Sequence, residues 1–289
     1  MEAILIPQTN HRPRPAILPA IPELQHPPSR HALQSLAQRL AGFSTIALAD
    51  MERASLQTRE DTKFMLGEST LFNLLDRLED SYRILCHCGS RVQPYHTLYF
   101  DTSDLQMYHA HHRGAAVRYK VRSREYVLSG LTMFEVKQKT LKGQTVKHRL
   151  QTPYILTDPR ALPHDFINKA YPDVPDDLRP ALWNRFWRVT LVNLVAPERV
   201  TLDFGLSFLH DGLTFPVPGI AIAEVKQRQR SRNTPFWRHL HDLSIGPSPI
   251  SKYCLGVTFT RPWVKQNNFK PLHRKLQRLT QGDHHERVH

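Results

Sequence analysis

The stretch AVRYKVRSREYVL, residues 116–128, alternates basic with mostly apolar side chains. Successive side chains of a β-strand point to opposite faces of the sheet. One face of the predicted strand therefore carries Arg118, Lys120, Arg122 and Arg124. The opposite face includes Val117, Tyr119 and Val121. A strand of this kind requires a polar environment along one whole face, because charged side chains are costly to bury without partners.

Three further stretches repeat the pattern, at residues 131–139, 144–150 and 220–228. Their charged positions are Glu135, Lys137, Lys139, Lys147, Arg149, Glu224, Lys226 and Arg228. Branched and aromatic residues also predict strands at 95–101, 186–195, 198–208 and 254–260. We therefore expect about eight antiparallel strands.

Two arrangements of these strands are open. A flat sheet could expose its charged face to water, as antiparallel sheets commonly do. Alternatively, the sheet curls into a barrel, and its charged interior then has to be hydrated and receive a polyanion, because like charges repel strongly in a dry interior. Repetition over four strands favours the second arrangement. We expect an α+β fold: an antiparallel β-barrel that forms a tunnel, with a few flanking helices.

Net charge points to the same kind of ligand. The 289 residues carry a formal net charge of +13, and ten basic residues against two acidic ones fall within residues 113–149. Concentrated positive charge predicts a polyanionic partner, which could be a nucleic acid, a nucleotide, an inorganic phosphate chain or an acidic membrane surface. The three cysteines and the absence of a secretory signal at the start favour a reducing cytoplasm.

Residues outside the strands divide the chain into three parts. We expect a proline-rich flexible leader with a short helix at residues 1–55, a tunnel domain at 56–262, and a basic, polar, loosely held tail at 263–289. The short helix, Leu33–Phe43, is expected to be an appendage. Apolar periodicity predicts a packing helix from Glu68 to Asp80. A second helix, opened by Pro235, should place Trp237 against the barrel.

Seven short motifs occur in order along the chain. They are Arg59-x-Asp61-x-Lys63, Tyr99-Phe100-Asp101-Thr102, Lys120-Val121-Arg122-Ser123-Arg124-Glu125-Tyr126, Phe134-Glu135-Val136-Lys137, Arg199-Val200-Thr201-Leu202-Asp203, Glu224-Val225-Lys226 and Ser251-Lys252-Tyr253. Together they resemble the polyphosphate polymerase catalytic domain of the vacuolar transporter chaperone (VTC) family, in its stand-alone, prokaryote-like form. The resemblance spans residues 56–262, and the ordered set is more specific than any single motif.

This resemblance implies a triphosphate-tunnel fold, open at both ends, and a metal-dependent phosphotransferase. In the implied reaction, the γ-phosphate of ATP moves onto the end of a growing inorganic polyphosphate chain, with Mn²⁺ or Mg²⁺ as cofactor. ATP and inorganic polyphosphate are the implied ligands, and specific nucleic-acid binding is not expected. The implied location is cytoplasmic, and a membrane protein partner that receives the product stays open.

The resemblance also implies roles for individual residues. Catalytic roles in the tunnel fall to Lys63, Arg122, Arg124, Lys137, Lys147, Arg188 and Lys252. Substrate contacts fall to Lys120, Lys139, Phe186, Lys226 and Ser251. The metal ligand is Glu224.

Some positions depart from the family pattern. Phe186 stands where the family tends to have tyrosine, and Pro249 stands where its eukaryotic members have lysine. A basic residue expected before the strand at 116–128 corresponds to Arg113, His111 or His112, and the sequence does not decide among them.

Two other functions stay open. Hydrolases of the tunnel superfamily carry Glu-x-Glu-x-Lys on the first strand, and here Arg59 replaces the first acid. Fewer acids favour a single-metal transferase over a two-metal hydrolase. The alternatives are a tunnel triphosphatase acting on nucleoside triphosphate or inorganic triphosphate, and a non-catalytic module that binds polyphosphate or nucleic acid. The run Cys86-His87-Cys88 lacks the usual spacing of zinc ligands, so a zinc site is not expected.

Overall fold

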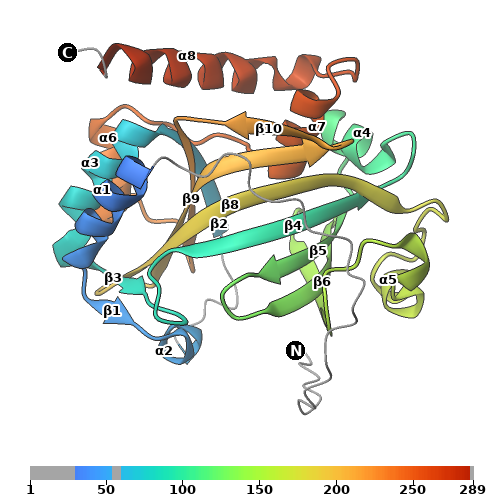
Figure 1. Ribbon diagram of the computed structural model, residues 1–289, viewed down its shortest axis with the longest axis horizontal. Coiled ribbons are helices and arrows are strands. Elements are labelled where there is room, and N and C mark those ends of the chain that lie inside the picture. The colour runs from blue at the N-terminus through green and yellow to red at the C-terminus, as the bar shows by residue number, and fades with distance from the viewer. Residues whose placement is uncertain (1–29, 54–59, 287–289) are drawn as a thin grey trace.

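One large antiparallel sheet organises the molecule (Figure 1), in a computed structural model that describes residues 30–53 and 60–286. Its main path of paired strands runs β2-β11-β9-β8-β4-β5-β6-β7. These strands are β2 (Glu60–Gly67), β4 (Gln93–Asp101), β5 (Arg118–Tyr126), β6 (Leu131–Lys139), β7 (Thr145–Thr152), β8 (Arg179–Asn193), β9 (Glu198–His210) and β11 (Ile220–Gln227). The short strands β1 (Thr45–Ile46), β3 (Tyr82–Leu85) and β10 (Leu213–Val217) pair off this path, β1 and β3 with each other in parallel.

Helices pack on both sides of the sheet (Figure 1). In chain order, those of the described residues are α1 (Arg30–Ala41), α2 (Leu48–Arg53), α3 (Glu68–Leu78), α4 (Gln106–His112), α5 (His164–Ala170), α6 (Pro235–Asp242), α7 (Lys252–Thr260) and α8 (Lys270–Glu286). The expected α+β class and antiparallel sheet are confirmed. The expected barrel is not closed by hydrogen bonds, because β2 and β7 stand at the two ends of the path and do not pair.

The helix α3 shows why the outer face of the sheet is apolar. Its buried residues Leu71, Leu74, Leu75 and Leu78 form one stripe at helical spacing. They join a core cluster with β2 and β11, in which Phe64 packs edge-on against Trp237 of α6 at 5.0 Å. The packing role expected for Trp237 is confirmed. Apolar residues of the strands therefore face the helices, which leaves their charged residues for the inner face.

The segment 254–260 is a helix and not the predicted strand. Its residues belong to α7, and nearly all side chains of α7 are buried. A short run that is apolar on every side shows neither the helical nor the strand period, so its sequence could not separate the two. The Ser251 hydroxyl accepts a hydrogen bond from the Cys254 amide at 3.3 Å and caps the helix. At Gly256, an added Cβ would lie 2.4 Å from Leu182, so only glycine allows the helix to sit this close to the sheet.

Two terminal segments are more firmly packed than their sequences indicate. The helix α1 was expected to be an appendage, yet Leu36 and Leu40 are buried in the same cluster as α3. The tail was expected to be loosely held, yet α8 contacts β2 and β11 and buries Leu276. In both helices a few leucines at helical spacing are enough to hold an otherwise polar element. The part of the leader from residue 1 to 29 lies outside the described residues.

Within the described residues, no helix has both the length and the apolar character that crossing a bilayer requires.

The substitution Leu40→Ala tests whether α1 is part of the fold. Removal of a side chain that is 1% exposed should lower the free energy of unfolding by about 2–5 kcal/mol, through lost burial and a residual cavity. Gln38→Ala, on the exposed side of the same helix, should change it by less than about 0.5 kcal/mol. Urea unfolding measures both variants, and equal stability of Leu40→Ala and the native protein would contradict the packing described.

Candidate functional site

The inner face of the sheet encloses a cavity of about 690 Å³. Strand residues that line it come from β2, β5, β6, β7 and β11: Asp61, Lys63, Arg118, Lys120, Lys137, Lys139, Thr145 and Glu224. Since β2 and β7 are opposite ends of the strand path, their presence around one cavity shows that the sheet curls into a trough. Several charged strand faces therefore converge on a shared hollow, as the alternation of charge along the strands predicts.

The other wall of the cavity comes from helices and loops. It is formed by His111, His112, Pro247, Ser248, Pro249, Ile250, Ser251, Cys254, Asn268, Phe269, Pro271, Leu272 and Lys275. Asp101 fixes part of this wall, because its carboxylate accepts hydrogen bonds from the amides of Met107 and Tyr108 at the start of α4 and from the hydroxyl of Tyr253 on α7. The Tyr-Phe-Asp-Thr motif thus ties the end of β4 to two helices.

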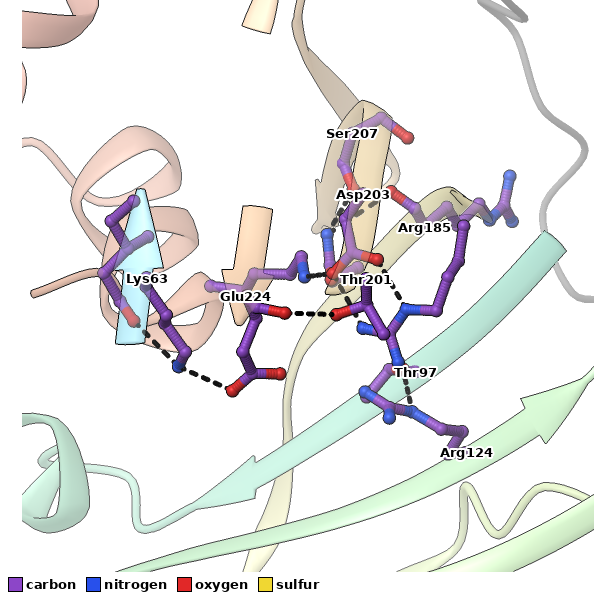
Figure 2. Close-up of polar contacts among 12 residues, drawn as sticks. Lys63, Thr97, Arg124, Arg185, Thr201, Asp203, Ser207 and Glu224 are labelled. Atoms are coloured by element: carbon purple, nitrogen blue, oxygen red, sulfur yellow. Dashed lines mark hydrogen bonds and ion pairs between the residues drawn. The ribbon is translucent and has the colours of Figure 1, made fainter. Parts of the chain in front are cut away.

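Glu224 faces Lys63 across the paired strands β11 and β2 (Figure 2). Their Oε1 and Nζ atoms lie 3.8 Å apart, and Lys226 donates a hydrogen bond to the other carboxylate oxygen. Burial alone would raise the pKa of Glu224, but Lys226 and Lys63 hold that pKa well below its ordinary value. Glu224 is therefore a carboxylate at neutral pH.

Asp203 on β9 holds a second pair of cations. Arg188 on β8 donates to both of its oxygens, at 2.6 and 2.7 Å, and Lys252 at the start of α7 binds one of them. This fork geometry is the strong form of an arginine–carboxylate pair. Although burial opposes ionisation, Arg188 and Lys252 lower the pKa of Asp203, so the group is charged.

Glu135 on β6 holds a third group of cations. Arg122 of β5 donates to it at 2.5 Å, Lys147 of β7 pairs with its other oxygen, and Arg149 Nε lies 3.3 Å from that same oxygen. The carboxylate has no exposure to solvent. Burial would raise the pKa of Glu135, but Arg122 and Lys147 keep it low.

Other lysines lack such a partner. Among the described residues, no carboxylate lies within ion-pair distance of Lys120, Lys137 or Lys139. Desolvation, together with the positive charge of Lys63, lowers the pKa of Lys120 to about 7 and that of Lys137 to about 8. Uncompensated positive charge next to a hollow is the electrostatic signature of an anion site.

Phe186 lies among cations and not in the cavity. Its ring stacks on Tyr95 with 5.1 Å between centroids, and Lys252 Nζ lies 4.2 Å from its centre. Arg188 and Arg124 also lie over this aromatic pair. Such contacts are attractive because the faces of aromatic rings are electron-rich. Phe186 is 1% exposed, so its visible role is to hold the positions of these cations.

The structure divides the predicted site residues into two groups. The cavity is lined by Lys63, Lys120, Lys137, Lys139, Ser251 and Glu224. Outside the cavity lining are Arg122, Arg124, Lys147, Phe186, Arg188, Lys226 and Lys252. Most of the second group are engaged with the three carboxylates, and Arg124 instead donates to Thr97 at 3.0 Å (Figure 2). The catalytic and binding roles of both groups stay predictions.

Sequence reasoning did not select several residues that line the cavity. Asp61 lines the cavity and stands at the second acidic position of the Glu-x-Glu-x-Lys motif. Its place two residues before Lys63 was the signal that could have identified it. His111 and His112 line the cavity, whereas Arg113 is exposed and does not. No sequence pattern indicated Lys275 as a cavity residue, because it lies on α8, a helix that the sequence did not predict. Arg59 lies outside the described residues.

Lys275 brings a cation to the loop that contains Pro249. Both residues line the cavity, and Lys275 Nζ donates to Ser248 Oγ at 2.8 Å. Thus a cation from α8 lies beside the loop position at which family members of another lineage are expected to have lysine.

Asp61 and Glu224 suit a hard divalent cation. Among the described residues no cluster of three or more His, Cys, Asp and Glu side chains is arranged for a metal. Mg²⁺ in phosphate-transfer sites, however, is commonly bound by one or two carboxylates together with substrate phosphates. Two acids at one cavity that is rich in lysine fit this joint mode of binding.

Comparison with known proteins decides the family. Residues 58–261 match the family model described as the VTC domain. The chain belongs to the VTC domain family. As a VTC-domain protein it is an enzyme that acts on phosphate compounds. A comparison with curated proteins finds no match.

Solved structures similar to this VTC-domain protein include two proteins proposed to be nucleotide cyclases. A proposed adenylate cyclase from Bacillus halodurans is 15% identical, with 68% of this chain and 96% of that chain covered and a TM-score of 0.44. A proposed adenylyl cyclase from Hippeastrum, described as having a dominant triphosphatase activity, is 18% identical, with 68% and 94% covered and a TM-score of 0.44.

The two lysines with lowered pKa values predict proton uptake on binding. At about pH 8, ATP phosphates placed beside Lys120 and Lys137 should raise both pKa values, so binding should take up protons, and below about pH 6 the uptake should vanish because both lysines are already charged. Titration calorimetry without metal, in two buffers of different ionisation enthalpy, measures the effect.

Two variants control this measurement. Lys120→Met should reduce the uptake, whereas Lys142→Met, in the exposed turn between β6 and β7, should leave it unchanged. Proton release, or equal uptake at both pH values, would contradict the charge state assigned to these lysines.

Proposed function

We propose that this protein is an ATP-dependent polyphosphate polymerase, which moves the γ-phosphate of ATP onto the end of an inorganic polyphosphate chain. The observation that carries the proposal is a cavity in which Lys120, Lys137 and Lys139 have no carboxylate within ion-pair distance among the described residues and lie beside the ionised Glu224. Unpaired cations at an enclosed site cost free energy unless an anion completes them. A chain of phosphates supplies many charges over the length of such a cavity.

The cavity lysines contribute positioning and charge. In the proposed step, the bond between the γ-phosphorus and the bridging oxygen of ADP breaks, and a bond from a terminal oxygen of the polyphosphate chain to that phosphorus forms. ADP leaves with the bridging oxygen. The nucleophile is already an anion, so little general-base work is required. Lys120, Lys137 and Lys139 hold the phosphate oxygens in line and stabilise the charge that they share in the transition state.

Asp61 and Glu224 are the residues that would hold a divalent cation, Mg²⁺ or Mn²⁺. When bound, such an ion would neutralise part of the charge of the substrate phosphates. Glu224 pairs with Lys63 and Lys226, and a cation held at its oxygens would leave both lysines available to phosphate.

The ion-paired cations are proposed to contact the product. Arg122, Arg188 and Lys252 lie close to the cavity but are neutralised by Glu135 and Asp203. Phosphates of a growing chain can take the place of carboxylate oxygens at arginine, because the guanidinium fork fits both groups. The tunnel wall would then exchange internal ion pairs for contacts with the polymer.

A triphosphatase is the second candidate. The observation that favours it is that Asp61 lines the same cavity as Glu224, so the site keeps two acids although Arg59 occupies the first acidic position of the motif. Hydrolysis would require water to take the place of the polymer end. Release of orthophosphate without any lengthened product would identify this activity.

The central experiment is incubation of the purified protein with ATP and Mn²⁺, followed by gel staining for long anionic polymer. The native protein should make polymer. Lys137→Ala should reduce the rate by about 10²-fold, as does removal of one preorganised donor to a transition state. Glu224→Gln, which keeps the shape of the side chain but removes its charge, should reduce the rate to a similar extent.

Lys142→Ala serves as the matched control, because this lysine is exposed in the turn that joins β6 to β7. It should retain the native rate, and all variants should keep the native melting temperature within a few degrees. Undiminished polymer synthesis by both Lys137→Ala and Glu224→Gln would exclude the proposed site. Orthophosphate as the sole product would favour the triphosphatase.

A further inference from the structure

The two walls of the cavity differ in chemistry. The strand wall presents lysines, as described above, whereas much of the opposite wall is apolar. Two segments form its apolar part, the loop at 247–250 and the C-terminal segment at 269–272. They contribute Pro247, Pro249, Ile250, Phe269, Pro271 and Leu272. A ligand that fills this cavity therefore meets positive charge on one side and an apolar surface on the other.

The apolar wall is held firmly in place. The ring of Phe269 lies 5.6 Å from that of His112 and 5.9 Å from that of Tyr108, measured between centroids. Asn268 donates its side-chain amide to the His112 carbonyl at 2.8 Å. Phe269 and Leu272 nonetheless remain partly exposed. Contacts of this kind fix the surface before a ligand arrives and lower the entropic cost of binding.

An inorganic phosphate chain does not account for this wall. Each of its units is charged and strongly hydrated, so contact with apolar side chains would cost free energy of desolvation without compensation. A nucleoside has the opposite character, because its planar base and sugar offer apolar surface with a few polar groups. Cavities of several hundred Å³ with apolar walls and a few polar groups are typical of sites for molecules of this size.

We propose that the C-terminal segment Asn268–Leu272 forms a nucleoside subsite, in which the base and ribose of a nucleoside triphosphate lie against Phe269 and Leu272 while its phosphates reach Lys120 and Lys137. The inference rests on the proposed function and adds to it a basis for preferring a nucleotide over inorganic triphosphate. The segment lies beyond residues 58–261, which match the family model, so the subsite belongs to this chain's own C-terminal part.

The test compares ATP with inorganic tripolyphosphate, which has the same number of phosphates but no nucleoside. Titration calorimetry in EDTA measures the affinity of both ligands without turnover. The native protein should bind ATP more tightly than tripolyphosphate. Phe269→Ala should weaken ATP about tenfold, which is the loss expected from one aromatic contact to a base, and should leave tripolyphosphate affinity unchanged.

Phe259→Ala is the matched control. Phe259 is also a partly buried phenylalanine of the same apolar cluster, where its ring packs against His273 of α8, but it does not line the cavity. This variant should bind both ligands as the native protein does. An effect of Phe259→Ala equal to that of Phe269→Ala would show that Phe269 acts only through packing, which would overturn the subsite.

The remaining outcomes separate this inference from the proposed function. If the native protein binds tripolyphosphate as tightly as ATP, the subsite is wrong and the phosphate site stands. If Phe269→Ala weakens both ligands equally, the subsite is again wrong. If the native protein binds neither ligand, the proposed function itself fails, and the subsite fails with it.

Discussion

Repulsion between like charges inside a curled sheet is the constraint to which the rest of the structure responds. The alternation of side chains in β5, β6, β7 and β11 directs basic residues to one side, and curling brings these sides together. Three carboxylates, Glu135, Asp203 and Glu224, offset this repulsion, and each is bound by two or three cations. They neutralise one part of the interior, and among the described residues Lys120, Lys137 and Lys139 of the cavity have no carboxylate within ion-pair distance. The same arrangement therefore permits folding and creates an anion site.

The packing of helices against the sheet positions the cavity wall that is formed by helices and loops. Apolar strand residues pack under α3 and α6, and α7 lies so close to the sheet that Gly256 is needed beneath Leu182. At the end of β4, Asp101 accepts hydrogen bonds from both α4 and α7. Apolar packing and the buried carboxylate of Asp101 thus place His111, Ser251 and the 247–250 loop across from the lysines.

Much of the strand wall was predictable because its signal is local. The alternation of side chains along each strand was enough to assign Lys120, Lys137 and Glu224 to the charged face of the sheet. The order of the motifs identified the family. The helical wall was less predictable because its signals are not local. Residues 254–260 are apolar in every direction, so periodicity could not show a helix, and the leucines of α8 are diluted by basic residues that hide their spacing. Nor can a sequence tell which lysines find a carboxylate, because the cations around Glu135 of β6 come from two other strands, β5 and β7.

Within the described residues, β7 pairs with a neighbouring strand on one side alone, which has a consequence for solubility. An edge strand offers free amides and carbonyls to any extended segment of another molecule, and such additions seed aggregation. In β7 the partly exposed Val146 and Leu150 alternate with Lys147 and Arg149. A second copy of this strand laid alongside would bring these cations together. The positive charge that favours phosphate binding inside the sheet therefore also disfavours pairing between the exposed β7 edges of two molecules.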